Sequence, residues 1–230
     1  MEHKPYGPYE AYIKRPLDFC LSLGALIVLS PIMGVTAILV KTKLGSPVLF
    51  TQDRIGKDEK MFKLYKFRSM TNERDDKGDL LPDDVRLTSF GRLLRSTSLD
   101  ELPELINIVK GDMAIIGPRP LLPSYLPYYN KTEHHRHDVK PGLSGLAQAK
   151  GRSFISWEDI FEYDIAYVNH ITFLIDCQIV IDTIFNLFSK SDVVDFSKVF
   201  VGNDGKKHIL VDNTDYVIHM PLDEERKKDN

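Results

Sequence analysis

The chain has 230 residues, a formal net charge of −3 at pH 7 and 43% hydrophobic residues. This length suits one domain, or one domain with appendages, and allows a hydrophobic core to form. The charge gives no overall basic field for binding nucleic acid, and Cys20 and Cys177 lack metal-ligand spacing, which indicates buried thiols in a reducing compartment.

The first predicted element is an uncharged run over residues 19–40. As a straight helix rising ~1.5 Å per residue it is long enough to cross a hydrocarbon layer of ~30 Å, so we predict a membrane segment. The run is too long for a secretory signal, and no small-residue cleavage site follows Val40. Pro31 near its middle predicts a kink, where Ser30 can donate to a carbonyl that proline leaves without a partner.

Positive charges flank both ends of this segment: Lys14 and Arg15 before it, and Lys41 and Lys43 after it. Because cytoplasmic flanks attract Lys and Arg, this symmetry favours no direction of crossing and suits a hairpin that returns to the cytoplasmic side. An ordinary kinked single-pass anchor is the alternative. The polar, turn-rich residues 1–16 are expected to form a loose or interfacial lead-in.

A β-hairpin is predicted next, with a short strand at residues 48–50 and an extended segment at residues 61–70. Lys66 and Arg68 share one face of the second strand. They are either contacts for an anion or solvated charges on an edge strand. The acidic residues 71–84 are predicted to form a solvated loop, because their carboxylates do not follow the spacing of a calcium-binding EF-hand.

An adjacent carboxylate pair, Asp100 and Glu101, lies within the run RSTSLDELPELINIVKGDMAIIGPRP. Ser98 and Glu101 have the spacing of a capping box, and apolar residues then repeat at helical intervals, so we predict a helix from Ser98 that stops at Gly111. Acidic residues in a first turn are also favoured by the helix dipole alone. The functional alternative is phosphate chemistry, because a helix N-terminus also attracts phosphate, and Mg²⁺ with arginines brings a carboxylate and a phosphate together.

Arginines lie on both sides of this predicted helix. Arg95 precedes it, at the end of a helical pattern over residues 85–94, and is the arginine nearest the carboxylate pair. Arg119 stands between Pro118 and Pro120, which restrict the backbone and fix where the guanidinium points. A rigid guanidinium suits a bidentate phosphate or carboxylate partner; the alternative is a turn salt-bridged to a core acid.

Three histidines, His134, His135 and His137, precede a turn-rich loop over residues 140–145. Adjacent histidines on one short helix cannot all face one ion, and no cysteine joins them. We therefore interpret them as surface or interfacial residues rather than metal ligands.

The C-terminal part is predicted to begin with two helices over residues 157–190. The second helix has a polar face that includes Asp176 and Asn186, opposite a broad apolar arc that suits either a core helix or one in the membrane interface. Residues 199–211 indicate a small hairpin, and the charged residues 223–230 indicate a disordered tail.

Three separated runs resemble the bacterial sugar transferase family: FTQDRIGKDEKMFKLYKFRSM at residues 50–70, SLDELPELINIVKGDMAIIGPRPLLPSY at 98–125 and KPGLSGLAQAKGR at 140–152. The resemblance covers roughly residues 9–195 in order. It is to the small monotopic polyprenyl-phosphate phosphoglycosyl transferases, such as the bacillosamine-phosphate transferase of N-glycosylation. Leu146 stands where this family commonly has tryptophan, which leaves the packing or ring stacking at this position open.

The resemblance implies an α+β fold, and we expect the chain to have three parts. Residues 1–44 would form a re-entrant membrane helix-break-helix, and residues 45–195 a mainly helical cytoplasmic catalytic domain with a small β-hairpin and interfacial amphipathic helices. Residues 196–230 lie beyond the resemblance, and their residue pattern predicts a C-terminal extension with a small hairpin and a disordered tail. The implied location is the cytoplasmic face of the bacterial inner membrane, in contact with membrane lipid, and the resemblance leaves open whether the protein is a homodimer.

The implied activity is transfer of a phospho-sugar from a UDP-sugar to polyprenyl (undecaprenyl) phosphate, which initiates assembly of an exopolysaccharide or glycoprotein glycan. Asp100 would carry a covalent phospho-sugar intermediate. Mg²⁺ is the implied cofactor, with Asp100 and Glu101 as catalytic residues and metal ligands. The alternatives are a non-catalytic membrane-anchored scaffold and a nucleotide-sugar hydrolase. The resemblance also implies five substrate-binding residues: Lys66, Arg95, Arg119, Gln148 and Arg152.

Overall fold

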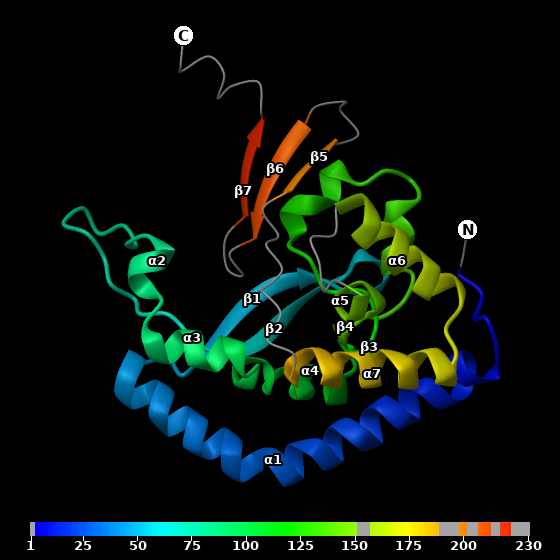
Figure 1. Ribbon diagram of the computed structural model, residues 1–230, viewed down its shortest axis with the longest axis horizontal. Coiled ribbons are helices and arrows are strands. Elements are labelled where there is room, and N and C mark those ends of the chain that lie inside the picture. The colour runs from blue at the N-terminus through cyan, green and yellow to red at the C-terminus, as the bar shows by residue number, and fades with distance from the viewer. Residues whose placement is uncertain (1–2, 151–156, 189–197, 202–206, 213–216, 222–230) are drawn as a thin grey trace. The chain divides into compact units, whose positions relative to one another are not determined.

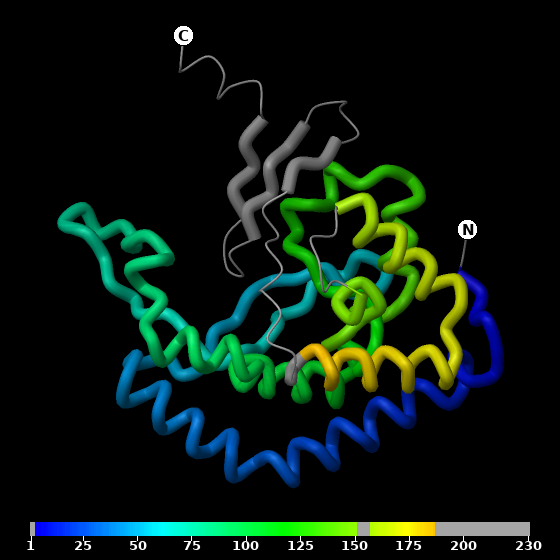
Figure 2. Tube along the Cα trace, in the orientation of Figure 1, coloured from blue at the N-terminus to red at the C-terminus, as the bar shows by residue number. Residues whose placement is uncertain are grey.

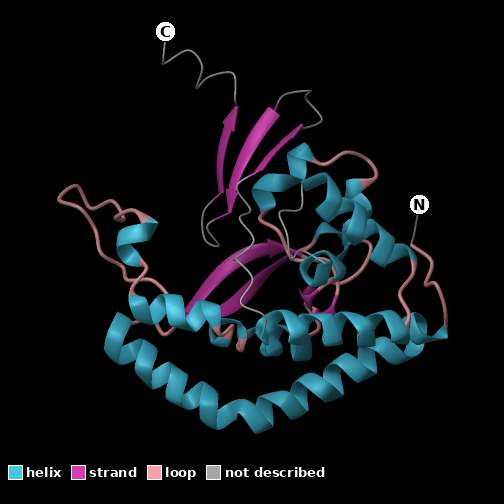
Figure 3. Cartoon of the chain, viewed as in Figure 1, coloured by secondary structure: helices cyan, strands magenta, loops and turns pink. Residues whose placement is uncertain are grey.

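The computed structural model describes residues 3–150, 157–188, 198–201, 207–212 and 217–221 (Figure 1). Helices predominate, and the strands form three small sheets (Figure 3), so the predicted mixture of helix and sheet is confirmed. The α-helices are α1 (Lys14–Leu44), α2 (Asp83–Arg86), α3 (Ser89–Ser96), α4 (Glu104–Lys110), α5 (Leu146–Lys150), α6 (Trp157–Asn169) and α7 (Phe173–Phe188). The strands are β1 (Leu49–Ile55), β2 (Met61–Phe67), β3 (Ala114–Ile116), β4 (Gly142–Ser144), β5 (Lys198–Val201), β6 (Lys207–Asp212) and β7 (Val217–Pro221). The shorter helical turns are η1 (Tyr9–Ile13), η2 (Lys57–Glu59), η3 (Leu99–Glu101), η4 (Pro123–Tyr128) and η5 (Glu133–His137).

The chain divides into two compact units, each built from separated segments. The first unit comprises Met1–Leu17, Asp53–Phe62 and Asp112–Asn230, and the second comprises Asp18–Gln52 and Lys63–Gly111. Helix α1 and strands β1 and β2 each run from one unit into the other. The division predicted at residues 44 and 195 stays a prediction.

Helix α1 is the long apolar element at the N-terminus, and Figure 1 shows it bent near its middle. Pro31 lies inside it, and the Ser30 hydroxyl donates to the Ile27 carbonyl at 2.8 Å. In a regular helix that carbonyl would bond to the N–H of residue 31, which proline lacks. The predicted kink is thus a bend in one continuous helix rather than a break. Residues 9–44 are long and apolar enough to cross a membrane, judged by length and composition.

The second unit has its hydrophobic core where α1 ends. Val40 and Leu44 of α1 pack with Phe67 of β2 and Leu94 of α3. The predicted hairpin is confirmed by the pairing of β1 with β2, although β1 extends to Ile55 and takes in part of the charged segment predicted as a turn. From β2 the chain follows the extended loop, traced in Figure 2, that leads to α2.

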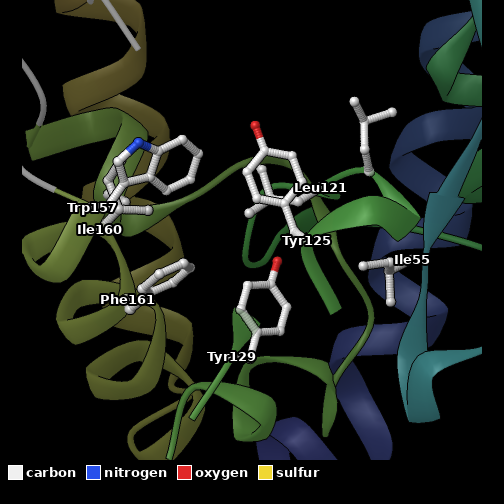
Figure 4. Close-up of a cluster of buried hydrophobic side chains, with 9 residues drawn as sticks. Ile55, Leu121, Tyr125, Tyr129, Trp157, Ile160 and Phe161 are labelled. Atoms are coloured by element: carbon white, nitrogen blue, oxygen red, sulfur yellow. The ribbon is translucent and has the colours of Figure 1, made fainter. Parts of the chain in front are cut away.

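The first unit has two hydrophobic clusters. In the cluster of Figure 4, the indole of Trp157 on α6 lies 5.8 Å from the Phe161 ring and 5.4 Å from the Tyr125 ring, measured between centroids. The second cluster packs α6 and α7 against the parallel pair β3 and β4. The residue that follows β3 must be glycine, because a Cβ at Gly117 would lie 2.4 Å from the Lys140 carbonyl oxygen.

Helix α7 is confirmed, but it turns its polar face inward. The Asp176 carboxylate is buried and accepts hydrogen bonds from Lys14 Nζ at 2.6 Å and from the hydroxyls of Tyr9 and Tyr167, each at 2.7 Å. Asn186 donates to the Ala149 carbonyl at 2.9 Å. Part of the predicted apolar arc faces outward, because Leu174, Ile181 and Phe185 are exposed. Three further apolar residues of α7 are exposed as well: Phe173, Val180 and Ile184.

The predicted C-terminal hairpin is confirmed by antiparallel pairing of β5 with β6. Strand β7, which was not predicted, pairs antiparallel with β6. The predicted disordered tail, residues 223–230, lies outside the described residues.

Candidate active site

Asp100 lies in the 3-10 helix η3, and not in the first turn of an α-helix as the capping-box pattern predicted. The α-helix that follows, α4, begins only at Glu104. Proline at position 103 has no N–H, so the α-helical hydrogen bond from residue 103 back to residue 99 cannot form. Ser98 has a left-handed φ of 53° and its side chain makes no capping hydrogen bond. The predicted stop is confirmed, because Gly111 ends α4 with a φ of 95°.

The Asp100 carboxyl group is buried, with 7% of the residue exposed. Burial raises its pKa to about 6, and repulsion by Glu101 acts in the same direction, while Lys66 and Arg95 oppose the shift. The carboxylate is therefore ionised at neutral pH in surroundings that favour loss of its charge. Forming a covalent bond through this oxygen, or binding a cation, relieves that unfavourable state.

Lys66 on β2 reaches the same carboxylate cluster. Its Nζ donates to Glu101 Oε1 at 2.9 Å and lies 3.5 Å from Glu104 Oε1. The residue is buried, so its interpretation as a solvated edge charge is wrong; the predicted phosphate contact stays a prediction. Sequence reasoning missed Glu104, whose only signal is its position three residues after Glu101.

Asn107 on α4 fixes this arrangement and was also missed. Its side-chain oxygen accepts from the Tyr65 N–H at 3.1 Å, and its amide donates to the Lys63 carbonyl at 2.8 Å. Because the amide completes the hydrogen bonds of the β2 backbone, it sets the register of α4 against β2, and hence of Glu101 against Lys66. The available signal was a polar residue among the apolar positions of this helix.

Arg95 is held by the close approach of α3 to residue 69. Its Nε donates to Ser69 Oγ at 2.9 Å. A Cβ at Gly91 would lie 1.8 Å from the Ser69 carbonyl oxygen, so only glycine allows α3 to lie this close. The Thr88 hydroxyl starts α3 by accepting the Gly91 N–H at 3.1 Å. The arginine is thereby near enough to Asp100 to lower the pKa of that carboxyl.

Arg119 belongs to the first unit, where its backbone is fixed by a buried ion pair. Arg136 Nη2 donates to the Arg119 carbonyl at 2.8 Å and to Asp164 Oδ2 at 2.6 Å. Whether the Arg119 guanidinium binds a phosphate or a core acid stays a prediction. Arg136 and Asp164 are both almost fully buried, which makes the turn that carries Arg119 a rigid element.

Gln148 on α5 is also in the first unit. Its amide donates to the Leu143 carbonyl at 3.4 Å, and its side-chain oxygen is buried with no hydrogen bond to any residue that the structure describes. An acceptor in this state suits a donor group on a ligand. Arg152 lies outside the described residues. The structure therefore brings together Lys66, Arg95, Asp100 and Glu101, and leaves the roles of the other substrate-binding candidates as predictions.

A family model described as bacterial sugar transferase matches residues 9–190. The chain belongs to the bacterial sugar transferase family. The resemblance carried by the three sequence runs is thus confirmed.

Curated relatives of this sugar transferase support the same assignment. It is 51% identical over 172 residues to the uncharacterized sugar transferase EpsL of Bacillus subtilis (strain 168), over 75% of this chain and 85% of the relative. It is 40% identical over 194 residues to the UDP-glucose:undecaprenyl-phosphate glucose-1-phosphate transferase of Klebsiella pneumoniae, over 80% of this chain and 42% of the relative. It is 36% identical over 186 residues to the UDP-N-acetylgalactosamine-undecaprenyl-phosphate N-acetylgalactosaminephosphotransferase of Aeromonas hydrophila, over 77% of this chain and 44% of the relative. The chain spans less than half the length of these last two relatives.

Proposed function

We propose that this sugar transferase moves a phospho-sugar from a UDP-sugar to undecaprenyl phosphate, and that Asp100 is the nucleophile. The observation that carries the proposal is a buried carboxylate, next to a second carboxylate, with Lys66 and Arg95 close enough to act on its pKa. The names of the relatives from Klebsiella pneumoniae and Aeromonas hydrophila support the class of reaction.

The proposed chemistry has two substitutions at one phosphorus atom. A carboxylate oxygen of Asp100 bonds to the phosphorus that carries the sugar, the bond from that phosphorus to the bridging oxygen breaks, and UMP leaves with the electron pair. An oxygen of undecaprenyl phosphate then bonds to the same phosphorus, and the aspartyl oxygen–phosphorus bond breaks. The products are undecaprenyl diphospho-sugar and the regenerated carboxylate.

The neighbouring side chains control charge in these steps. Lys66 offsets part of the negative charge of Glu101 and Glu104, which limits their repulsion of an incoming diphosphate. Arg95, oriented by Ser69, supplies a guanidinium to a phosphate oxygen near Asp100. By the family resemblance, Arg119, Gln148 and Arg152 hold the remaining phosphate and nucleotide groups.

The residues present also suit Mg²⁺. Burial raises the pKa of Asp100, and repulsion by the adjacent Glu101 adds to this shift. Carboxylates are hard oxygen ligands of the kind that Mg²⁺ prefers. Asp100 and Glu101 would hold the ion, with Glu101 alternatively facing the incoming phosphate. Bound Mg²⁺ would neutralise negative charge on the diphosphate of the donor.

Part of the proposal is that α1 enters the membrane and returns to the same side. At ~1.5 Å per residue, α1 and η1 together exceed a hydrocarbon thickness of ~30 Å, and the Ser30 hydroxyl satisfies the carbonyl that Pro31 leaves without an N–H partner. Lys14 and Arg15 precede the apolar run and Lys41 and Lys43 follow it, and this symmetry of positive charge favours no direction of crossing.

We further propose that α7 lies in the membrane interface. Its outward side chains are apolar and well exposed, with 77% exposure for Leu174 and 63% for Phe185. The polar groups of this helix are already paired with the protein. Its contiguous exposed apolar face therefore suits the boundary between lipid headgroups and acyl chains. By the family resemblance, such an interfacial helix would hold the active site at the bilayer surface.

The proposed reaction is tested with purified protein in lipid nanodiscs, using Mg²⁺, a panel of UDP-sugars and undecaprenyl phosphate. The wild type should release UMP continuously only when the lipid acceptor is present. Without the acceptor it should release at most one equivalent of UMP and retain label from a sugar-labelled donor. Asp100→Asn should form no labelled enzyme, whereas Asp84→Asn, at an exposed carboxylate, should be labelled like the wild type.

Three results would contradict this reading. Labelled Asp100→Asn enzyme would show that the nucleophile lies elsewhere. Continuous UMP release without acceptor would indicate a hydrolase, and no UMP release from any donor would favour a scaffold.

A further inference from the structure

A second polar cluster, formed by Glu59, His134 and His137, belongs entirely to the first unit. Glu59 is in the turn between β1 and β2, and the two histidines are on the 3-10 helix η5. With 3.0 residues per turn, a 3-10 helix aligns side chains three positions apart, so the two imidazoles share one face. One potential ligand atom from each residue lies within 4.8 Å of the others.

The contacts within this cluster are short. His134 Nδ1 lies 2.5 Å from Glu59 Oε1, and His137 Nδ1 lies 3.7 Å from the same oxygen. The sequence analysis interpreted all three histidines as surface or interfacial residues, because adjacent histidines on one short helix cannot all face one ion. That interpretation is wrong for His137, which is buried. Glu59 of the hairpin turn is a third potential ligand from elsewhere in the chain, while His135 pairs with Asp138 at 2.9 Å.

His137 is buried in a way that a purely structural role does not explain. Only 5% of the residue is exposed, and neither buried ring nitrogen makes a hydrogen bond of good geometry to the described residues. Buried imidazole nitrogens without such hydrogen bonds suit coordination of a metal ion.

We propose that Glu59, His134 and His137 bind a divalent transition-metal ion, with Zn²⁺ the preferred ion. Imidazole nitrogen with one carboxylate suits Zn²⁺, whereas Mg²⁺ prefers oxygen ligands. Three protein ligands leave a fourth tetrahedral position for water. The ion would tie the turn of the β1–β2 hairpin to η5 and is separate from the carboxylates proposed for catalysis.

The present spacing needs only a small opening to accept such an ion. Tetrahedral ligands at about 2.0–2.2 Å from Zn²⁺ lie roughly 3.3 Å apart. The Glu59–His134 contact is shorter than this, but both side chains have room to move, with 42% and 39% exposure. The turn is also unusual, because Asp58 and Glu59 have left-handed φ values of 53° and 58° without being glycine. Such strained backbone is often retained where a side chain has a specific task.

The test is Zn²⁺ binding measured by equilibrium dialysis and metal analysis on chelator-treated protein in nanodiscs. Both the wild type and an Asp100→Asn, Glu101→Gln variant should bind one Zn²⁺ per chain with the same affinity. His134→Ala and Glu59→Gln change partly exposed side chains and should fold normally by circular dichroism. Loss of a residue that only supports a metal ligand weakens metal binding roughly 10- to 100-fold. Loss of a ligand itself, in either variant, should weaken Zn²⁺ binding by more than that. The matched control, His135→Ala, should bind like the wild type.

Co²⁺ substitution gives a second readout, because four-coordinate Co²⁺ absorbs visible light strongly. That absorption should be present in His135→Ala and lost in His134→Ala. Three results would overturn the proposal: a wild type that binds no Zn²⁺, wild-type binding retained by both Glu59→Gln and His134→Ala, or binding lost in the Asp100→Asn, Glu101→Gln variant.

Discussion

Asp100, the proposed nucleophile, carries a charge that lowers the stability of the folded protein. A carboxylate that is buried beside a second carboxylate is more stable protonated, and the nearby Lys66 and Arg95 offset this only in part. The opposing effects leave the pKa at about 6, so most molecules carry the charged, nucleophilic form at neutral pH. The folded protein therefore carries a destabilising charge at the position where the proposed chemistry needs one.

This charge makes a pH-dependent prediction for metal-free protein. The pKa of Asp100 rises from 3.8 to about 6 on folding, so the folded state binds the proton more tightly, and stability falls as pH rises between about 4 and 6. Asp100→Asn removes the charge and should stabilise the protein by up to roughly 3 kcal/mol at pH 8, with about half that gain at pH 5. Thermal unfolding of both proteins across this pH range, with a chelator present, checks it.

The exposed Asp84→Asn variant serves as the control and should change the unfolding temperature little at either pH. An Asp100→Asn gain that is equal at pH 5 and pH 8, or a loss of stability at pH 8, would show that the carboxylate is not destabilising in the folded protein.

At the scale of elements, the features predicted correctly depend on local backbone chemistry. Pro31 and Ser30 predicted both the bend and the hydroxyl-to-carbonyl hydrogen bond, because the carbonyl that proline leaves unpaired lies one turn away. Gly111 predicted the end of a helix for a similarly local reason. The start of that helix was predicted wrongly, because the missing N–H of Pro103 outweighs a capping box at Ser98.

Features that depend on packing between distant segments could not be predicted from the sequence. Asn107 has its role only because α4 lies against the backbone of β2, more than forty positions earlier in the chain. The orientation of α7 is a similar case. Its periodicity correctly separates polar from apolar faces, but only the approach of Lys14 and Tyr167 makes the Asp176 side the buried one.

The Asp176 network makes a stability prediction. Asp176→Ala removes the acceptor of Lys14, Tyr9 and Tyr167 and leaves the buried ammonium of Lys14 without this carboxylate. Breaking a buried ion pair in this way costs about 3–5 kcal/mol, equivalent to roughly 2–4 °C of unfolding temperature per kcal/mol in a chain of this size. Thermal unfolding in nanodiscs should therefore show a decrease of at least about 6 °C.

Two further variants make this measurement specific. Asp182→Ala on the same helix loses contacts with Gln178 and Lys150 at a partly exposed position and should lower the unfolding temperature by less than about 3 °C. The double variant Lys14→Met, Asp176→Leu should recover more than half of the loss, because the pair is removed together. Equal effects of Asp176→Ala and Asp182→Ala would contradict the buried network.

Gly91 allows helix α3 to hold Arg95 at the candidate active site. Alanine there would place a methyl group against the Ser69 carbonyl oxygen, forcing α3 away and moving Arg95 from its partner. Overpacking of this kind costs about 1–3 kcal/mol, and phospho-sugar transfer should fall at least about tenfold. Gly34→Ala, at a helix glycine whose added Cβ would meet nothing within 4 Å, should retain stability and activity. Thermal unfolding and UMP release measure both effects; a fully active Gly91→Ala enzyme would contradict the positioning of Arg95.

At the scale of the whole molecule, both ends of α1 are committed to folded protein. Lys14 is bound by Asp176 in the first unit, and Val40 and Leu44 are buried in the core of the second. The apolar middle of the helix is exposed, and its exposed residues include Leu21, Ile27, Val28, Val35 and Ile38. This exposed apolar middle is the part of α1 that would enter lipid in the proposed re-entrant arrangement.

This topology predicts the accessibility of the two ends in intact cells. In a variant with Cys20 and Cys177 replaced by serine, single cysteines at positions 5 and 43, Pro5→Cys and Lys43→Cys, should both resist a membrane-impermeant maleimide and react once the cells are made permeable. A single-pass helix would instead leave one of them reactive from outside. A cysteine on an engineered extracellular loop of an unrelated membrane protein in the same cells confirms that the reagent is active. Labelling of only one of the two positions before permeabilisation would show that α1 crosses the bilayer, and would remove the topological basis for placing Asp100 and the lipid acceptor on one membrane face.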